Sequence, residues 1–345
     1  MDFQNLVEVR KNHYFNINNL NSWLQVHYNK FGSALAVKQF IGGQSNPTFV
    51  ISFKNQKKLI LRKKPPGMLL PSAHAIEREY KVQKALEDSK VPCPKMLVIC
   101  NDDAVIGTPF YLMEAVIGKV YDNILDIKDI EIRKSIYLQS VKMLAILHNI
   151  KFIKIGLGDF GKTGNYVNRQ ILRWEKQWHL SKQREVPEML KIIKWLNKNI
   201  PDFDDTTLVH GDFRLGNIIY GKNNRINAIL DWELSTLGHP FSDLGYLIYP
   251  HYLSIGERHG LNGVDYNNEN IPTVNEIIKV YCETRGIKEF DPTFYVILSM
   301  FRSISILEGV YARSVKGNAS SPSAKLIGKD VIPLAKTAYK IIKSL

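Results

Sequence analysis

The stretch Leu208–Glu233, LVHGDFRLGNIIYGKNNRINAILDWE, decides the fold that we expect for this chain. Short apolar runs alternate in it with polar turns, and the residues that follow the runs include Asp212, Asn217 and Asp231. Apolar runs separated by turn residues are typical of short β-strands, and a tight turn between strands returns the chain to the same edge. We therefore expect these three polar residues to gather at one edge.

The three side chains suit phosphoryl transfer. A hydroxyl that attacks the γ-phosphate of ATP needs a carboxylate to orient it and accept its proton, and the triphosphate needs divalent metal held by oxygen ligands. Asp212 can provide the carboxylate, while Asn217 and Asp231 can hold the metal. This order of Asp, Asn and a second Asp after a hairpin is that of the protein-kinase catalytic loop and its metal-binding Asp. The pattern predicts a kinase with ATP and Mg²⁺ as cofactors.

Two departures from the protein-kinase pattern indicate a particular family. The kinase His-Arg-Asp reads HGD at 210–212, and the Asp-Phe-Gly reads DWE at 231–233. In both features the chain resembles the aminoglycoside phosphotransferase and choline kinase family of small-molecule kinases. The resemblance implies an α+β, bilobal, protein-kinase-like fold with a small β-rich N-lobe and a larger, mostly helical C-lobe. We place the N-lobe at residues 1–116 and the C-lobe at residues 117–345.

The same motif also has a structural interpretation, as an ordinary turn. Asp and Asn are common turn formers, so the first Asp and the Asn alone fit an ordinary turn as well. Asp231 and a further acid, Asp243 in GHPFSDL at 238–244, favour the catalytic interpretation. We expect Asp243 to brace the loop and to perform no chemistry.

Candidate nucleotide contacts lie in the N-lobe. Two β-like segments flank IGGQSNP at 41–47, where Ser45 is a candidate phosphate contact over the triphosphate. The strand KLILRKK at 58–64 ends in cations, of which Arg62 is implied by its family position to pair with the phosphates; an exposed basic run is the alternative. In the helix predicted at Ser72–Leu86, Glu79 is the candidate partner of Arg62 and Glu77 is the competitor.

The segment FYLMEAVIG at 110–118 is expected to be a strand that runs into a linker. The resemblance implies that this is the hinge that reads the adenine edge, through the carbonyl of Glu114 and the amide of Val116. An edge strand is the alternative interpretation. The position of the segment between Arg62 and the catalytic loop favours the hinge.

The acceptor pocket is expected in the C-lobe. The helix that starts at Tyr166 combines aromatic and basic residues, and the resemblance implies that such a segment shapes the pocket. The candidate substrate contacts are Arg169, Arg173, Trp174 and Arg313, the last from a helix predicted at 291–315. Core packing of the tryptophan and a solvated helix face are the alternatives.

Four phrases resemble one subgroup of the family. LRKKPPG at 61–67, LPSAHAIEREY at 70–80, LDWELSTLGHP at 230–240 and YARS at 311–314 are similar to the phosphotransferase-like domain that occurs alone or fused ahead of acyl-CoA dehydrogenase domains. The resemblance implies phosphorylation of a hydroxy acid or hydroxyacyl-CoA, and it makes an acyl-CoA dehydrogenase a candidate partner. An aminoglycoside phosphotransferase and a non-catalytic nucleotide-binding module are the alternatives.

Composition narrows the partners. The net charge of +13 favours an anionic small-molecule acceptor, whereas a polycationic aminoglycoside would need an acidic pocket. No aromatic-basic RNA motif or helix-turn-helix signal accompanies the charge, so nucleic acid is not expected. No apolar run approaches the roughly 18 residues of a membrane span. Because three cysteines make no disulfide framework and the first residues carry acids, we expect a cytoplasmic protein without a secretory signal.

Overall fold

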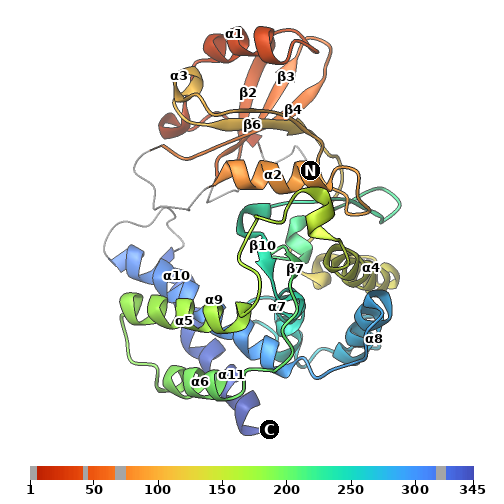
Figure 1. The fold of residues 1–345 in the computed structure, drawn as a ribbon, viewed down its shortest axis with the longest axis vertical. Coiled ribbons are helices and arrows are strands. Elements are labelled where there is room, and N and C mark those ends of the chain that lie inside the picture. Colours follow the sequence, from red (N-terminus) through yellow and green to blue (C-terminus); the bar gives the residue numbers. More distant parts are fainter. Residues whose placement is uncertain (1–5, 42–45, 67–74, 316–323) are drawn as a thin grey trace. The chain divides into compact units, whose positions relative to one another are not determined.

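The computed structural model describes residues 6–41, 46–66, 75–315 and 324–345 (Figure 1). The chain divides into two compact units. The first comprises Met1–Val120 and Asn217–Ser235, and the second comprises Tyr121–Gly216 and Thr236–Leu345. The lobe boundary predicted after residue 116 remains a prediction, but the contacts group the hairpin that follows the catalytic loop with the first unit.

A six-stranded antiparallel sheet organises the first unit, in the strand order β1-β2-β3-β4-β6-β5 (Figure 1). The strands are β1 (Leu6–Val7), β2 (Ala34–Phe40), β3 (Thr48–Phe53), β4 (Lys58–Lys63), β5 (Met96–Cys100) and β6 (Phe110–Glu114). Alternate residues of β3 point to opposite faces, so Phe49 and Ile51 join the core under α1 (Ile17–His27), while Val50 joins the core under α2 (Ile76–Leu86). A short helix, α3 (Asp103–Ile106), precedes β6.

The strand β6 lies between β4 and β5, with Leu61 and Val98 both opposite Leu112. The edge-strand interpretation of residues 110–118 is therefore wrong. Both neighbours of β6 take part in its hydrogen bonding, and its side chains from Phe110 to Met113 are buried.

The hairpin of β8 (Ile218–Tyr220) and β9 (Ile226–Ile229) is attached to the first unit by its backbone. Tyr220 and Lys119 exchange two backbone hydrogen bonds of 2.8 Å, and the Ile229 amide donates to the Pro92 carbonyl at 2.8 Å. These bonds make the hairpin an extension of the first unit, although it follows the catalytic loop in sequence.

The second unit is mostly helical. Its helices are α4 (Ile130–His148), α5 (Tyr166–Ser181), α6 (Pro187–Lys198), α7 (Pro240–Ile248), α8 (Val274–Arg285), α9 (Thr293–Val315), α10 (Ala324–Ile327) and α11 (Val331–Lys343). A two-stranded sheet pairs β7 (Thr207–Val209) with β10 (Thr236–Gly238). Single 3-10 turns lie at Lys11–His13, Ile124–Asp126, Phe152–Ile155, Leu215–Asn217, Trp232–Leu234, Tyr249–Tyr252 and Gly328–Asp330.

The helix α9 is the centre of this unit and packs against α5, α6, α7, α10 and α11. It is long and apolar enough to cross a membrane by those two measures alone, but 83% of its most apolar window is buried inside the fold. Its apolar surface is therefore used in packing the helical core.

Candidate active site

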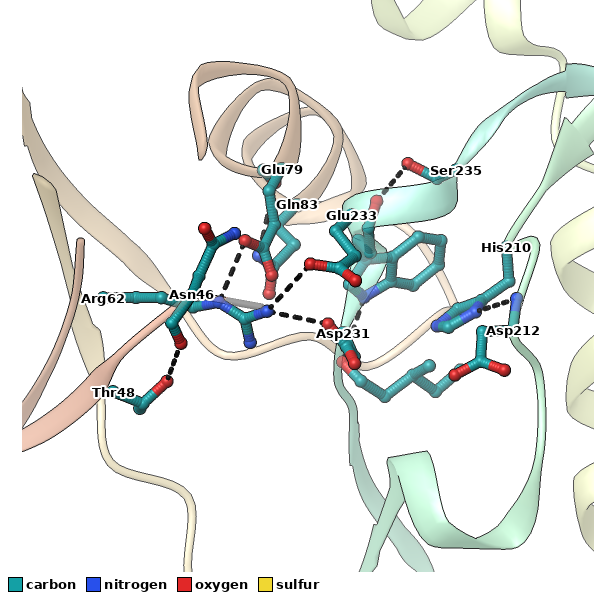
Figure 2. Close-up of polar contacts among 12 residues, drawn as sticks. Asn46, Thr48, Arg62, Glu79, Gln83, His210, Asp212, Asp231, Glu233 and Ser235 are labelled. Carbon is teal, nitrogen blue, oxygen red and sulfur yellow. Dashed lines mark hydrogen bonds and ion pairs between the residues drawn. The ribbon is translucent and has the colours of Figure 1, made fainter. Parts of the chain in front are cut away.

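Arg62 lies at the centre of an acidic cluster in the first unit (Figure 2). Its Nε lies 3.1 Å from Oε2 of Glu79, and its Nη2 lies 2.7 Å from Oδ1 of Asp231 and 3.7 Å from Oε2 of Glu233. The predicted pair of Arg62 and Glu79 is thus present. Glu233 belongs to the DWE motif, but sequence reasoning assigned no role to it; its position two residues after Asp231 was the available signal.

The next two cations in sequence, Lys63 and Lys64, and the alternative acid, Glu77, have contacts of their own. Nζ of Lys64 lies 2.5 Å from Oε1 of Glu77, so Glu77 does not replace Glu79 as the partner of Arg62. Lys63 points to the opposite sheet face, is 3% exposed and lies 5.2 Å from the ring centroid of Phe15. The alternative of an exposed basic run is therefore wrong.

Three carboxylates around one guanidinium leave this cluster with an excess of negative charge. Burial opposes the charge of Arg62, but the attraction of Glu79, together with those of Asp231 and Glu233, raises the pKa of Arg62. Burial raises the pKa of Glu79 to about 7, although the Arg62 guanidinium acts in the opposite direction. Such a cluster favours the binding of a further cation.

The hairpin brings Asn217 and Asp231 to the same end. Ile218 pairs with Ile229, and the amide of Leu230 donates to the carbonyl of Asn217 at 2.8 Å. Asp231 has φ 64° and ψ 57°, a left-handed conformation that costs a non-glycine residue roughly 1–2 kcal/mol. Backbone strain of this kind is concentrated at functional sites, and here it accompanies the contact of the carboxylate with Arg62.

The donors at this end fit a magnesium ion that arrives with a nucleotide. Asp231 offers carboxylate oxygen and Asn217 amide oxygen, both hard ligands of the kind that Mg²⁺ prefers. Among the described residues, no group of three or more His, Cys, Asp or Glu could hold a metal by itself. Mg²⁺ commonly binds through one or two protein side chains and the phosphates of its substrate, so a pair of ligands is sufficient.

The remaining nucleotide candidates lie in the same unit. Ser45 is outside the described residues. The next residue, Asn46, is fully buried, and neither polar atom of its side chain has a hydrogen-bond partner in the described part of the chain, as expected of a group that awaits a ligand. Glu114 ends β6 and Val116 follows it; their contacts with adenine remain predictions.

In the second unit, Asp212 lies on a loop whose backbone is held by hydrogen bonds to Asp243. The amides of His210 and Gly211 donate to Oδ2 and Oδ1 of Asp243 at 2.7 and 2.8 Å. The amide of Asp212 donates to Nδ1 of His210 at 3.2 Å (Figure 2). Gly211 has φ 84°, which glycine adopts without the steric cost of a Cβ. The expected bracing by Asp243 is confirmed.

Asp243 is held as a carboxylate although it is 2% exposed. Its other neighbour, His148, lies 3.3 Å away through Nε2, and Nδ1 of His148 lies 2.7 Å from the hydroxyl of Tyr281. Burial alone would raise the pKa of Asp243, but the hydrogen bonds from His148 and the loop lower it. Burial lowers the pKa of His148. These contacts give His148 a structural role.

The Asp212 side chain is 22% exposed, and its neighbours were missed from sequence. Nε of Arg214 lies 3.7 Å from Oδ2 of Asp212, and the hydroxyl of Tyr246 hydrogen-bonds to the same carboxylate. Arg214 also lies 3.4 Å from Oδ1 of Asp122. Arg214 is within the catalytic motif and was open to prediction, whereas Tyr246 comes from α7, which was not predicted.

The candidate acceptor residues are only partly brought together. The guanidinium of Arg173 lies 5.1 Å from the Trp174 ring, and a further arginine, Arg302, lies 5.8 Å from the same ring. Arg169 donates to the carbonyls of Gly164 and Lys162, so it holds the start of α5. Arg313 is exposed near the end of α9. The roles of all four candidates in substrate binding stay predictions.

Comparisons with known proteins agree with this geometry. Residues 36–263 match the model of the phosphotransferase enzyme family. The chain is 40% identical over 353 residues to human acyl-CoA dehydrogenase family member 11, in an alignment that covers 98% of this chain and 44% of that protein. The chain thus spans less than half the length of that relative.

Solved structures show the same fold. A crystal structure from Ralstonia eutropha JMP134, described as a candidate aminoglycoside phosphotransferase, has a TM-score of 0.87 and 39% identity, over 96% of this chain and 99% of that one. Spectinomycin phosphotransferase in complex with ADP and spectinomycin has a TM-score of 0.61 and 14% identity, over 95% and 99%. The second likeness concerns the fold alone.

These findings define a small-molecule phosphotransferase with a hydroxyl group as acceptor, built on the kinase-like α+β fold that the motifs implied. The chain belongs to the phosphotransferase enzyme family. The predicted resemblance to domains found with acyl-CoA dehydrogenases is confirmed by its human relative.

Proposed function

We propose that this protein transfers the γ-phosphate of ATP, with Mg²⁺, to the hydroxyl of a hydroxy acid or a hydroxyacyl-CoA. The observation that carries this proposal is the loop that Asp243 braces, which presents Asp212 beside the cation of Arg214. The ADP in the spectinomycin phosphotransferase structure supports the use of an adenine nucleotide.

In the proposed reaction, each residue of the site has a defined role. The acceptor oxygen forms a bond to the γ-phosphorus while the bond from that phosphorus to the ADP oxygen breaks, and Asp212 takes the hydroxyl proton. Arg62, oriented by Glu79, binds the α- and β-phosphates. Mg²⁺, when bound by Asn217 and Asp231, would offset the charge of the phosphates.

An anionic acceptor is favoured by charge. The chain carries +13, and the cation of Arg214 lies 3.7 Å from the Asp212 carboxylate. The human relative is named as an acyl-CoA dehydrogenase, which supports a hydroxyacyl acceptor and a dehydrogenase as partner or fused domain. A cytoplasmic location, and the lack of nucleic-acid and membrane partners, remain part of this proposal.

The test is consumption of ATP by the purified protein with Mg²⁺ across hydroxyacyl-CoAs, free hydroxy acids, choline and kanamycin. Asp212→Ala should retain nucleotide binding and lose transfer by about 10²–10⁴-fold, the range for a lost general base. Asp202→Ala, which removes an exposed carboxylate from the same unit, is the matched control and should keep full activity.

Each outcome separates the alternatives. Turnover confined to hydroxyacyl compounds would support the proposal, and turnover on kanamycin would make the protein an aminoglycoside phosphotransferase. Tight ATP binding without transfer to any acceptor would favour a non-catalytic nucleotide-binding module. Normal turnover by Asp212→Ala would remove Asp212 from its assigned role.

A further inference from the structure

Arg302 of α9 is a half-buried arginine with aromatic neighbours. Other arginines of its unit contact a carboxylate, as in the pairs Arg133–Glu269, Arg184–Glu308 and Arg285–Asp205. No carboxylate forms an ion pair with Arg302 in the described ranges of the chain, although its side chain is half-buried. A partly desolvated guanidinium is stabilised by an anion, so Arg302 is suited to an anionic partner that comes from outside the fold.

Two aromatic rings hold this guanidinium. Its Cζ lies 5.8 Å from the ring centroid of Trp174 in α5 and 5.5 Å from that of Tyr246 in α7. Cation–π attraction acts on the charge of the guanidinium and uses none of its hydrogen-bond donors, so its N–H groups stay suited to hydrogen bonds with an anion. Arg173, whose guanidinium lies 5.1 Å from the same Trp174 ring, adds a second positive charge.

The same arrangement connects Arg302 to the proposed chemistry. The Tyr246 hydroxyl hydrogen-bonds to the Asp212 carboxylate, while the Tyr246 ring contacts Arg302. One aromatic side chain therefore separates the unpaired guanidinium from the carboxylate assigned to the reacting hydroxyl. Arg302, Tyr246 and Asp212 all belong to the second unit.

We propose that Arg302 binds the anionic group of the acceptor while the acceptor hydroxyl lies at Asp212, with Trp174 and Tyr246 holding the guanidinium in place. This inference rests on the proposed function and deepens it, because it names the residue that selects an anionic acceptor. The anion is a carboxylate of a free hydroxy acid or a phosphate of coenzyme A, and both accept hydrogen bonds from a guanidinium.

The experiment compares wild type and Arg302→Gln on three forms of one acceptor: β-hydroxybutyrate, its neutral primary amide and its CoA thioester. Hydrogen bonds to charged groups contribute about 1.5–3 kcal/mol, so kcat/KM for the anionic form should fall by roughly 10–100-fold, mainly through KM. The neutral amide should be used equally by both proteins. If kcat/KM of Arg302→Gln falls on the free acid, the carboxylate is the group that Arg302 binds. If it falls on the thioester alone, a coenzyme A phosphate is that group.

Three controls keep the inference open to refutation. Lys194→Gln removes an exposed charge from α6 of the same unit and should change nothing. Arg302→Lys retains the charge and should recover part of the selectivity. Tyr246→Phe keeps the ring under Arg302 but removes the hydroxyl at Asp212, so it should lower kcat and preserve the preference for the anion.

Equal losses on the amide and on both anionic forms, or no loss on any of them, would overturn the inference. Binding of the three acceptor forms by calorimetry, in the presence of a non-hydrolysable ATP analogue, separates this result from failure of the proposed function. If wild type phosphorylates none of them, anion-selective binding that disappears in Arg302→Gln would still support the anion site, and its absence would refute it.

Discussion

At the scale of single residues, the Arg62 cluster places more negative than positive charge in a nearly closed environment. Glu79 is 1% exposed, and its partner Arg62 is shared with Asp231 and Glu233. A carboxyl in this position is expected to hold its proton at a higher pH than in water, which agrees with a pKa of about 7.

Glu79 therefore makes folding depend on pH in a defined direction. At low pH both folded and unfolded states hold the proton. As the pH rises the unfolded state releases its proton first, so the free energy of unfolding falls by up to about 1.4 kcal/mol per pH unit until the pH reaches the folded pKa. We therefore compare the unfolding free energy of Glu79→Gln with that of wild type at each pH. From about pH 5 to pH 7 this difference should move in favour of the variant by about 2–3 kcal/mol, and above pH 7 it should stay constant.

Urea denaturation of both proteins across this pH window measures the difference. Glu77→Gln removes a half-exposed carboxyl from the same helix and is the matched control. A pH dependence that is parallel in the two variants would contradict the explanation by burial.

At the scale of elements, the hairpin β8–β9 holds Asn217 and Asp231 close together through its backbone alone. The contact of Gly118 with this hairpin is especially close: an added Cβ would lie 2.3 Å from the Tyr220 carbonyl oxygen and 2.5 Å from Cγ2 of Ile219. A side chain at this position must displace β8, the strand that directly follows Asn217.

Gly118→Ala should therefore destabilise the first unit by about 1–3 kcal/mol, the usual cost of overpacking, and weaken the binding of Mg²⁺-nucleotide. Thermal unfolding and nucleotide titration measure the two effects. Gly158→Ala is the control, because its Cβ would meet no neighbouring atom closer than 4.0 Å. An unchanged Tm and nucleotide affinity in Gly118→Ala would show that the hairpin position does not depend on this contact.

At the scale of the whole molecule, the net charge of +13 should act on the acceptor before it binds. A positive field raises the encounter rate of anions, and salt screens it over about 10 Å at 0.1 M ionic strength. With saturating ATP and Mg²⁺, kcat/KM for an anionic hydroxy acid should fall by about tenfold between low and high salt. A neutral amide acceptor should show little change, and an equal salt response of both acceptors would refute steering by charge.

Much of the first unit could be predicted from sequence because each of its strands is a short continuous apolar segment. The strand predicted at 58–64 forms as β4, Lys58–Lys63, and Arg62 on it pairs with Glu79 of α2. Helix ends were less accurate: the helix predicted at 291–315 begins two residues later, at Thr293, as α9.

The second unit was harder to predict where its elements are short or enclosed. The helix α7 was missed because nearly all of its residues are buried, so no polar stripe marks it as a helix. Tyr246 was missed with this helix, and so was the contact of its ring with Arg302.

The sequence by itself determined the family and the fold class, and it predicted the phosphotransfer residues Asp212, Asn217 and Asp231 because they lie in one short motif in a characteristic order. Only the tertiary structure decided which charges meet. Asp243 under the loop, Glu233 on Arg62, and Arg302 between Trp174 and Tyr246 are contacts between segments distant in sequence or on different elements. Such contacts depend on packing and burial, which no local pattern of residue types specifies.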